Sequence, residues 1–255
     1  GNSEKTKNIF KKRLSFDVNK NKFNYSGKYF LDEIITLDKL LSNYSLEDIA
    51  AGLQNFTEEI LLKYIKNIFN KYNINKTKIV LSGGVFANVL LNKKISELKE
   101  VEEVFIHPHM GDGGLALGSA FALINEYSKK NKKIFLELKK LKNTYFAKNF
   151  NDYEIREELK KYNIDYKEFN NIELEIAKLL SKGKVVARFN SAMEYGPRAL
   201  GNRTIFYQAN DKSVNDWLNK RLKRTEYMPF APIINEDYAD KYFYINEASK
   251  YSMQF

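Results

Sequence analysis

Two stretches with the pattern of a strand, a glycine turn and a helix constrain the fold of this chain most. The first, KIVLSGGVFANVLLNKKI, spans residues 78–95 and turns at Ser82-Gly83-Gly84. The second spans residues 102–128, with Asp112 among glycines before a helix that we expect to start near Leu115. Such units gather main-chain N–H groups and the positive helix end at one spot, where a nucleotide phosphate or ribose can bind. Glycine turns of this kind also serve close packing alone, and the Gly-Gly pair does not decide between these roles.

Asp112 and two histidines are the candidate polar groups of the second unit. A carboxylate at position 112 can cap the following helix, bind a metal or hold a ribose hydroxyl. The two His of the chain, His107 and His109, form an H-x-H pattern that places both side chains on one face of a strand. This pattern fits a metal pair, but no second ligand cluster accompanies it, so a structural role is favoured.

The preceding part of the chain predicts helices. A short amphipathic helix is expected over 30–41, and residues 1–30 show no clear period. Ser45 is a good N-cap, with Asp48 three residues later, for a long helix that ends near Asn73. The apolar face of the long helix predicts core packing, and we expect no functional site on it.

The second half of the chain alternates helix and strand patterns. After a Lys-rich connection at 128–150, the sequence predicts a helix from Asp152, a strand over 164–169, a helix that ends at Gly183, and the strand KVVARF. This order indicates an α/β domain.

The segment from Arg188 to Thr204, RFNSAMEYGPRALGNRT, concentrates Arg and Gly directly after that strand. Its glycines let the backbone approach a ligand closely, and the guanidinium groups of Arg198 and Arg203 match phosphate or carboxylate oxygens bidentately. The alternative is a turn whose arginines form surface salt bridges. Because the arginines alternate with Gly and Pro straight after a buried strand, we favour anion binding.

A further helix with a basic edge is predicted from Ser213, and the PFAP sequence at 229–232 ends it. Lys223, Arg224 and Glu226 are the polar candidates there, against the alternative of a solvated helix face, which we accept for Lys220.

The composition narrows the class of protein. A net charge of +10 suits an anionic partner, but Lys is scattered over all 255 residues without a basic stripe, so nucleic-acid binding is disfavoured. The absence of Cys excludes disulfides and thiolate chemistry. No stretch approaches the length of a membrane span and no signal peptide is visible, so we expect a cytoplasmic protein.

Four segments together resemble the O-carbamoyltransferase family of nodulation-factor and antibiotic biosynthesis. They are SGGVFANVLLN, VFIHPHMGDGGLALGSA, GKVVARFNSAMEYGPRALGNRTI and LNKRLKRTEYMPFAP, and they occur in the expected order. The resemblance implies an α/β fold: the second half of an ASKHA domain (actin, Hsp70 and sugar-kinase-like), residues 1–130, followed by a YrdC-like domain, residues 131–255. It implies that the YrdC-like domain forms carbamoyl-adenylate from ATP and carbamoyl phosphate. The ASKHA domain then transfers the carbamoyl group to a hydroxyl of a sugar or natural product.

The resemblance also implies roles for residues. Arg198, Arg203, Lys223 and Arg224 would neutralise the phosphates in a catalytic pocket, with Arg188 beside them. Gly83, Gly84 and Asn88 would hold the adenylate, and Asp112 would ligate a divalent metal of the iron type.

The family's N-terminal H-x-x-H-type motif does not occur in this sequence. We therefore expect a fragment that lacks the first half of its ASKHA domain and does not bind the metal by itself, and whose YrdC-like domain is incomplete. The alternatives are an ASKHA-type sugar kinase or ATPase, which leaves GPRALGNR unexplained, and an RNA-binding module related to tRNA threonylcarbamoylation.

Overall fold

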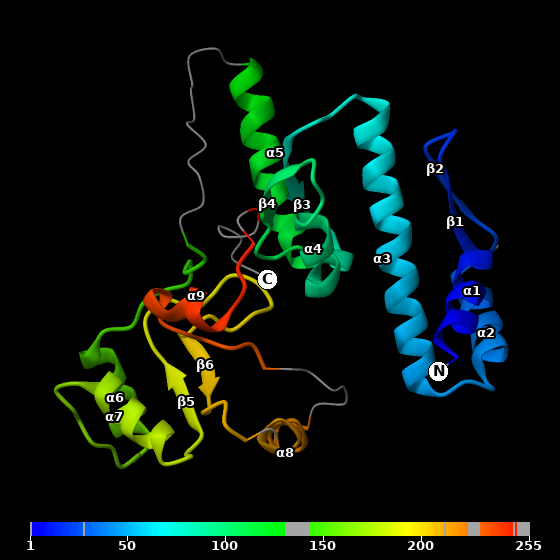
Figure 1. Ribbon diagram of the computed structural model, residues 1–255. Helices are drawn as coiled ribbons and strands as arrows, with labels where there is room; N and C mark the ends of the chain where they lie inside the picture. Colours follow the sequence, from blue (N-terminus) through cyan, green and yellow to red (C-terminus); the bar gives the residue numbers. More distant parts are fainter. Residues whose placement is uncertain are drawn as a thin grey trace. The chain divides into compact units, whose positions relative to one another are not determined.

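A computed structural model describes residues 2–27, 29–130, 143–211, 213–223, 230–246 and 248, which form two compact units (Figure 1). The first unit contains the described residues of 1–111 and 246–255, and the second those of 112–245. Both units combine helices with small sheets, so the predicted α/β class is confirmed. The division into domains at 1–130 and 131–255 stays a prediction.

The first unit begins with a helix and a hairpin that the sequence did not reveal. Its elements are α1 (Ser3–Arg13), β1 (Leu14–Asp17), β2 (Lys22–Tyr25), α2 (Phe30–Leu41), α3 (Leu46–Lys71), β3 (Thr77–Leu81), the 3₁₀ turn η1 (Gly84–Ala87), α4 (Val89–Ser96) and β4 (Val101–Ile106). The predicted N-cap of α3 is confirmed, because the Ser45 side chain accepts a hydrogen bond from the Asp48 N–H.

Helix α1 packs along α3 at very short range (Figure 1). A Cβ atom on Gly52 would lie 2.0 Å from Oγ1 of Thr6, so only glycine allows this crossing. The Thr6 hydroxyl is fully buried and donates to the carbonyl of Asp48. Phe10 and Phe56 stack next to it and belong to a small apolar core, with ring centroids 6.0 Å apart.

Strands β3 and β4 are parallel neighbours, and α4 connects them. A βαβ unit of this kind buries the connecting helix against the sheet. The main core of the first unit lies here, and its fully buried members are Leu91, Ile95, Val104 and Ile106.

The second unit centres on an antiparallel pair of strands. Its elements are the 3₁₀ turn η2 (Asp112–Gly114), α5 (Leu115–Lys130), α6 (Asp152–Lys161), α7 (Ile172–Ser181), β5 (Val186–Phe189), β6 (Arg203–Phe206), α8 (Ser213–Arg221), the 3₁₀ turn η3 (Glu236–Tyr238) and α9 (Ala239–Tyr242). The pairing of β5 with β6 places Arg188 opposite Thr204 and Phe189 opposite Arg203. Gly183 follows α7 with a φ of 72°, as its predicted place at the helix end requires.

The predicted strand at 164–169 is wrong. Asn163 adopts a left-handed φ of 50° and Ile164 donates its N–H to the carbonyl of Leu159, and these features end α6. Residues 164–169 follow the helix without forming a strand. A bidentate ion pair between Arg156 and Glu168 then holds this stretch. The apolar alternation was present, but β5 is paired with β6 and no ladder reaches this segment within the described chain.

Candidate functional site

The turns after β3 and β4 lie next to each other at the carboxyl ends of the parallel strands. Gly83 has a φ of 127°, which favours glycine, and its N–H donates to the carbonyl of Met110 at 2.7 Å. A Cβ atom on Gly111 would lie 4.0 Å from the Cα of Gly84, whereas one on Gly84 would meet nothing within 4 Å. The Gly83 N–H therefore links the loop after β3 to the loop after β4, and the space beside Gly84 is open.

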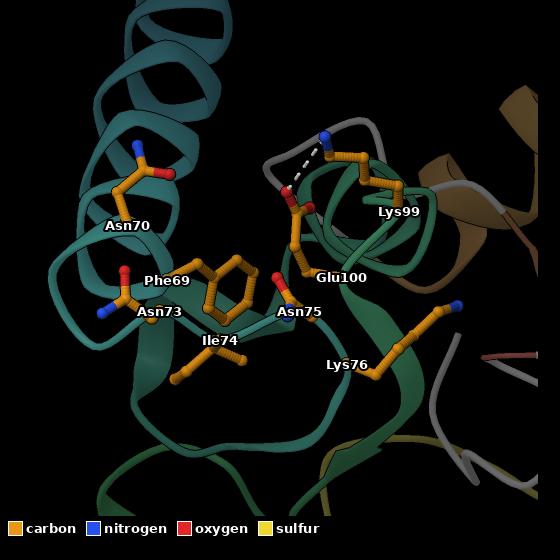
Figure 2. A pocket seen from close by; sticks show the side chains of 8 residues that line it. All are labelled: Phe69, Asn70, Asn73, Ile74, Asn75, Lys76, Lys99 and Glu100. Atoms are coloured by element: carbon orange, nitrogen blue, oxygen red, sulfur yellow. Dashed lines mark ion pairs between the residues drawn. The ribbon is translucent and has the colours of Figure 1, made fainter.

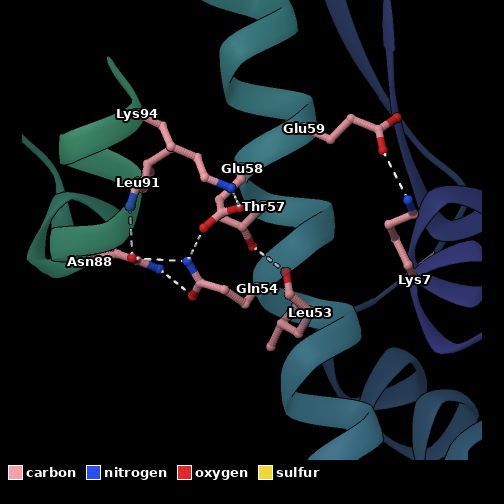
Figure 3. Close-up of polar contacts among 9 residues, drawn as sticks. All are labelled: Lys7, Leu53, Gln54, Thr57, Glu58, Glu59, Asn88, Leu91 and Lys94. Carbon is pink, nitrogen blue, oxygen red and sulfur yellow. Dashed lines mark hydrogen bonds and ion pairs between the residues drawn. The ribbon is translucent and has the colours of Figure 1, made fainter. Parts of the chain in front are cut away.

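Asn88 organises the start of α4. Its side-chain oxygen accepts from the Leu91 N–H at 3.1 Å, so it is the N-cap. The same amide forms a reciprocal pair with Gln54 of α3, with bonds of 2.7 and 3.1 Å (Figure 3). Asn88 is thus held from two sides before any ligand binds.

The contact network continues on α3. Gln54 donates to the carboxylate of Glu58 at 2.8 Å, and the ammonium group of Lys94 on α4 forms an ion pair with the other oxygen (Figure 3). Burial acts to raise the pKa of Glu58, but the hydrogen bonds from Lys94 and Gln54 hold it below its usual range. The sequence predicted only core packing for α3. The spacing of Gln54 and Glu58 does not indicate a functional role for either residue.

Asp112 begins η2 with an exposed side chain. His107 and His109 follow β4 rather than lying within it, because the strand ends at Ile106. Across the described residues, no three His, Asp or Glu side chains gather where they could hold a metal ion. The metal role of Asp112 stays a prediction.

The Arg- and Gly-rich segment forms the loop that connects β5 to β6 and is built around a buried carboxylate. Glu194 is only 7% exposed, and its Oε1 accepts the N–H groups of Leu200 at 2.9 Å, Asn202 at 2.7 Å and Arg203 at 3.1 Å. Burial acts to raise the pKa of Glu194, but these main-chain donors lower it below the usual value. The main-chain N–H groups of the loop therefore bind a carboxylate of the loop itself. The predicted binding of an anionic ligand by its arginines stays a prediction.

The arginines of this segment differ in their partners. The Arg203 guanidinium donates to the carbonyls of Asn190 at 2.6 Å and Ser191 at 3.0 Å and lies 3.5 Å above the Phe189 ring. Arg188 forms an ion pair with Glu173 of α7 at 3.0 Å. The predicted alternative of arginines in salt bridges therefore describes Arg188 well, and Arg203 binds carbonyl groups of the loop instead.

Arg198 lies half-buried in the loop between Gly196 and Gly201, which have φ angles of 121° and 105°. Lys223 follows α8 with a left-handed φ of 52°, and Arg224 lies outside the described residues. The phosphate-binding roles of Arg198, Arg203, Lys223 and Arg224 stay predictions.

Glu194 is the functional candidate that the sequence analysis missed. Its carboxylate precedes a Gly-Pro turn, but nothing in the spacing indicates that the N–H groups of 200, 202 and 203 converge on it.

A separate hollow of about 660 Å³ lies at the other end of β3 and β4. Figure 2 shows residues from the end of α3 on one side and the Lys99–Glu100 ion pair on the other. Its lining is mostly polar and contains no residue of the predicted sites: Phe69, Asn70, Asn73, Ile74, Asn75, Lys76, Lys99 and Glu100.

No helix in the described part of the chain combines the length and apolar character needed to cross a lipid bilayer.

Comparisons with known proteins place these sites in one family. A family model described as carbamoyltransferase N-terminus matches residues 3–121, and one described as carbamoyltransferase C-terminus matches residues 177–255. The first match contains the glycine turns and the second contains the β5–β6 loop.

Individual relatives agree with this assignment. An uncharacterized protein of Methanocaldococcus jannaschii is 39% identical over 228 residues, which cover 86% of this chain and 41% of the relative. Nodulation protein NolO of Bradyrhizobium diazoefficiens is 27% identical over 207 residues, or 80% of this chain and 36% of that protein. The 3'-hydroxymethylcephem-O-carbamoyltransferase of Streptomyces clavuligerus is 27% identical over 214 residues, or 81% and 38%.

The chain spans roughly a third to two fifths of the length of these relatives. Two family models together match most of its length, in the order in which their names place them. The chain therefore belongs to the carbamoyltransferase family, together with the nodulation proteins and the cephem O-carbamoyltransferase, as its motifs predicted.

Proposed function

We propose that this chain takes part in an O-carbamoyl transfer that uses ATP and carbamoyl phosphate. The observation that carries the proposal is the β5–β6 loop, which presents Arg198 from a turn fixed by hydrogen bonds, inside the segment that matches the family's C-terminal model. A guanidinium group on a main chain that is already fixed binds a phosphate with less loss of conformational freedom than one on a free loop. The loop would bind carbamoyl phosphate and the ATP phosphates while carbamoyl-adenylate forms.

The glycine turn after β3 is the proposed seat of the adenylate. The open side of Gly84 would admit a nucleotide close to the main chain, next to the start of α4. Asn88 uses its side-chain oxygen for the helix cap and for Gln54, so its contribution to a ligand would come from the amide hydrogen that remains.

The acceptor in this proposal is a hydroxyl of a small molecule. The name of the Streptomyces clavuligerus relative specifies a hydroxymethyl group as the site of O-carbamoylation in that protein. By this likeness we infer a sugar or natural-product hydroxyl here, with the ASKHA-type and YrdC-like domains in the roles that the family motifs imply. The described residues do not assemble a metal site, and the proposal gives them no metal-dependent step.

Calorimetric titration with carbamoyl phosphate and with ATP tests the proposal. Arg198→Ala should weaken binding of carbamoyl phosphate by about tenfold or more, the loss of one charge-assisted contact. Arg156→Ala is the matched control, since it removes an arginine of the same unit whose partner is Glu168 on the surface. The proposal fails if the unsubstituted chain binds neither ligand, or if the two variants bind carbamoyl phosphate equally well.

A further inference from the structure

We propose that Glu194 is a positioning residue that fixes the short loop 195–199 and thereby holds Arg198 in place for its anionic ligand. The inference deepens the proposed function and rests on it, since it gives the carboxylate a task only if Arg198 binds a phosphate-bearing molecule. Neither the charge pattern nor the motif assigns Glu194 this task.

The contacts of Glu194 close the loop at both of its ends. The chain leaves Glu194, passes through Tyr195 to Ala199, and returns so that the Leu200 N–H donates to the carboxylate at 2.9 Å. The N–H groups of Asn202 and Arg203 add bonds of 2.7 and 3.1 Å. Arg198 therefore lies within a loop whose first and last flanking residues are joined by one buried side chain.

Contacts with residues 144–145 restrain the same ends of the loop. The N–H of Tyr195 donates to the carbonyl of Thr144 at 2.6 Å, and the hydroxyl of Tyr145 donates to the carbonyl of Leu200 at 2.8 Å. An isolated bridge pairs Tyr145 with Glu194. With both ends tied, removal of the carboxylate leaves these contacts in place, so the loop loosens without losing its attachment.

The hydrogen bonding of the carboxylate distinguishes positioning from proton transfer. Oε1 accepts the N–H groups of Leu200, Asn202 and Arg203, and the Arg203 N–H is shared with Oε2 at 3.1 Å, so three main-chain donors engage the carboxylate. A general acid or base needs an oxygen that reaches the substrate. Glu194 is 7% exposed and turned toward the main chain, which suits a fixed acceptor.

A graded set of variants tests the inference. Glu194→Ala removes all of the acceptors, whereas Glu194→Gln keeps one oxygen that can occupy the place of Oε1. Glu168→Ala is the matched control, because it removes an exposed carboxylate of the same unit that pairs with Arg156. Far-UV circular dichroism checks that each variant is folded.

Two of the measurements need no ligand. Hydrogen exchange at the amides of 200, 202 and 203 should be faster by about tenfold or more in Glu194→Ala, intermediate in Glu194→Gln and unchanged in Glu168→Ala. The rate at which phenylglyoxal modifies Arg198 should change most in Glu194→Ala, less in Glu194→Gln and not at all in Glu168→Ala. Unchanged exchange at these amides in Glu194→Ala overturns the inference whether or not a ligand binds.

Calorimetric titration with carbamoyl phosphate supplies the third measurement. Glu194→Ala should bind about tenfold more weakly than the unsubstituted chain, with Glu194→Gln between them. If Glu194→Ala binds carbamoyl phosphate as tightly as the unsubstituted chain, the inference is overturned and the proposed function stands. If the unsubstituted chain does not bind, the proposed function fails and Glu194 has no ligand to position.

Discussion

Glu58 in the first unit and Glu194 in the second are both buried, and they receive their hydrogen bonds from different kinds of donor. Glu58 is 5% exposed and receives its hydrogen bonds from the side chains of Lys94 and Gln54. Glu194 is 7% exposed and receives its bonds from the main chain of Leu200, Asn202 and Arg203. The partners of Glu58 can be replaced together with it, whereas the donors of Glu194 remain whatever residue stands at 194. We therefore expect that Glu58 can be replaced together with its partners, and that the loop requires the carboxylate of Glu194.

The largest effect is expected at Glu194. Glu194→Ala leaves buried N–H groups without an acceptor, each at a cost of about 1–3 kcal/mol, and we expect the second unit to lose about 2–4 kcal/mol of its free energy of unfolding. Urea unfolding followed by the fluorescence of Trp217, the one tryptophan of the chain and part of α8, measures this loss. A loss no greater than that of the exposed variant Glu168→Ala would contradict the comparison.

A smaller and reversible effect is expected at Glu58. Glu58→Ala should cost about 1–2 kcal/mol, because Lys94 is half exposed and regains water. Replacing both partners, Glu58→Met with Lys94→Met, should restore most of the loss, since an apolar pair can substitute for a buried ion pair. Urea unfolding followed by circular dichroism compares the variants. A double variant no more stable than Glu58→Ala would show that this carboxylate is as irreplaceable as Glu194.

The amide pair between Gln54 and Asn88 should contribute less again. A double-mutant cycle with Gln54→Ala and Asn88→Ala is expected to give a coupling free energy of about 0.5–1.5 kcal/mol. Asn171→Ala is a useful control for the cap alone, because Asn171 caps α7 through the Leu174 N–H. Coupling near zero would mean that Asn88 acts only as a helix cap and that α3 does not position the glycine turn.

Acidification should produce the smallest effect, since a protonated carboxyl keeps an acceptor oxygen. The pKa of Glu194 is lower in the folded chain than the value of about 4.3 for an unperturbed glutamate. Its contribution to stability is therefore complete above about pH 4.3 and is lost as the pH falls through the folded pKa. Unfolding free energies measured from neutral to acidic pH should fall less steeply in Glu194→Gln than in the unsubstituted chain. Parallel curves would contradict this assignment.

The sequence predicted the elements whose cause is local. Ser45 caps α3, Gly183 ends α7, and the glycine turns after β3 and β4 follow from patterns of a few residues. Contacts between distant residues escaped prediction. The approach of α1 to Gly52 and the hydrogen bond from the Leu200 N–H to Glu194 depend on the folded geometry, which spacing does not encode.

The same limit applies to the candidate site. The Arg- and Gly-rich segment was predicted to bind an anionic ligand through its guanidinium groups, and this role stays a prediction. Arg203 supports the loop through carbonyl oxygens, and the charge at the centre belongs to Glu194. Residue types indicated that charged groups gather in this segment, but they did not indicate which groups form hydrogen bonds with each other.

A main-chain donor survives every substitution except one to proline, which has no N–H. Position 200 can therefore accept many side chains in related sequences without loss of its bond to residue 194. Position 202 should accept fewer residue types, because the Asn202 side chain also donates to the carbonyl of Ala192 at 2.7 Å. Sequence drift in this loop should leave an acidic residue at 194 nearly fixed while position 200 varies, with proline missing from it.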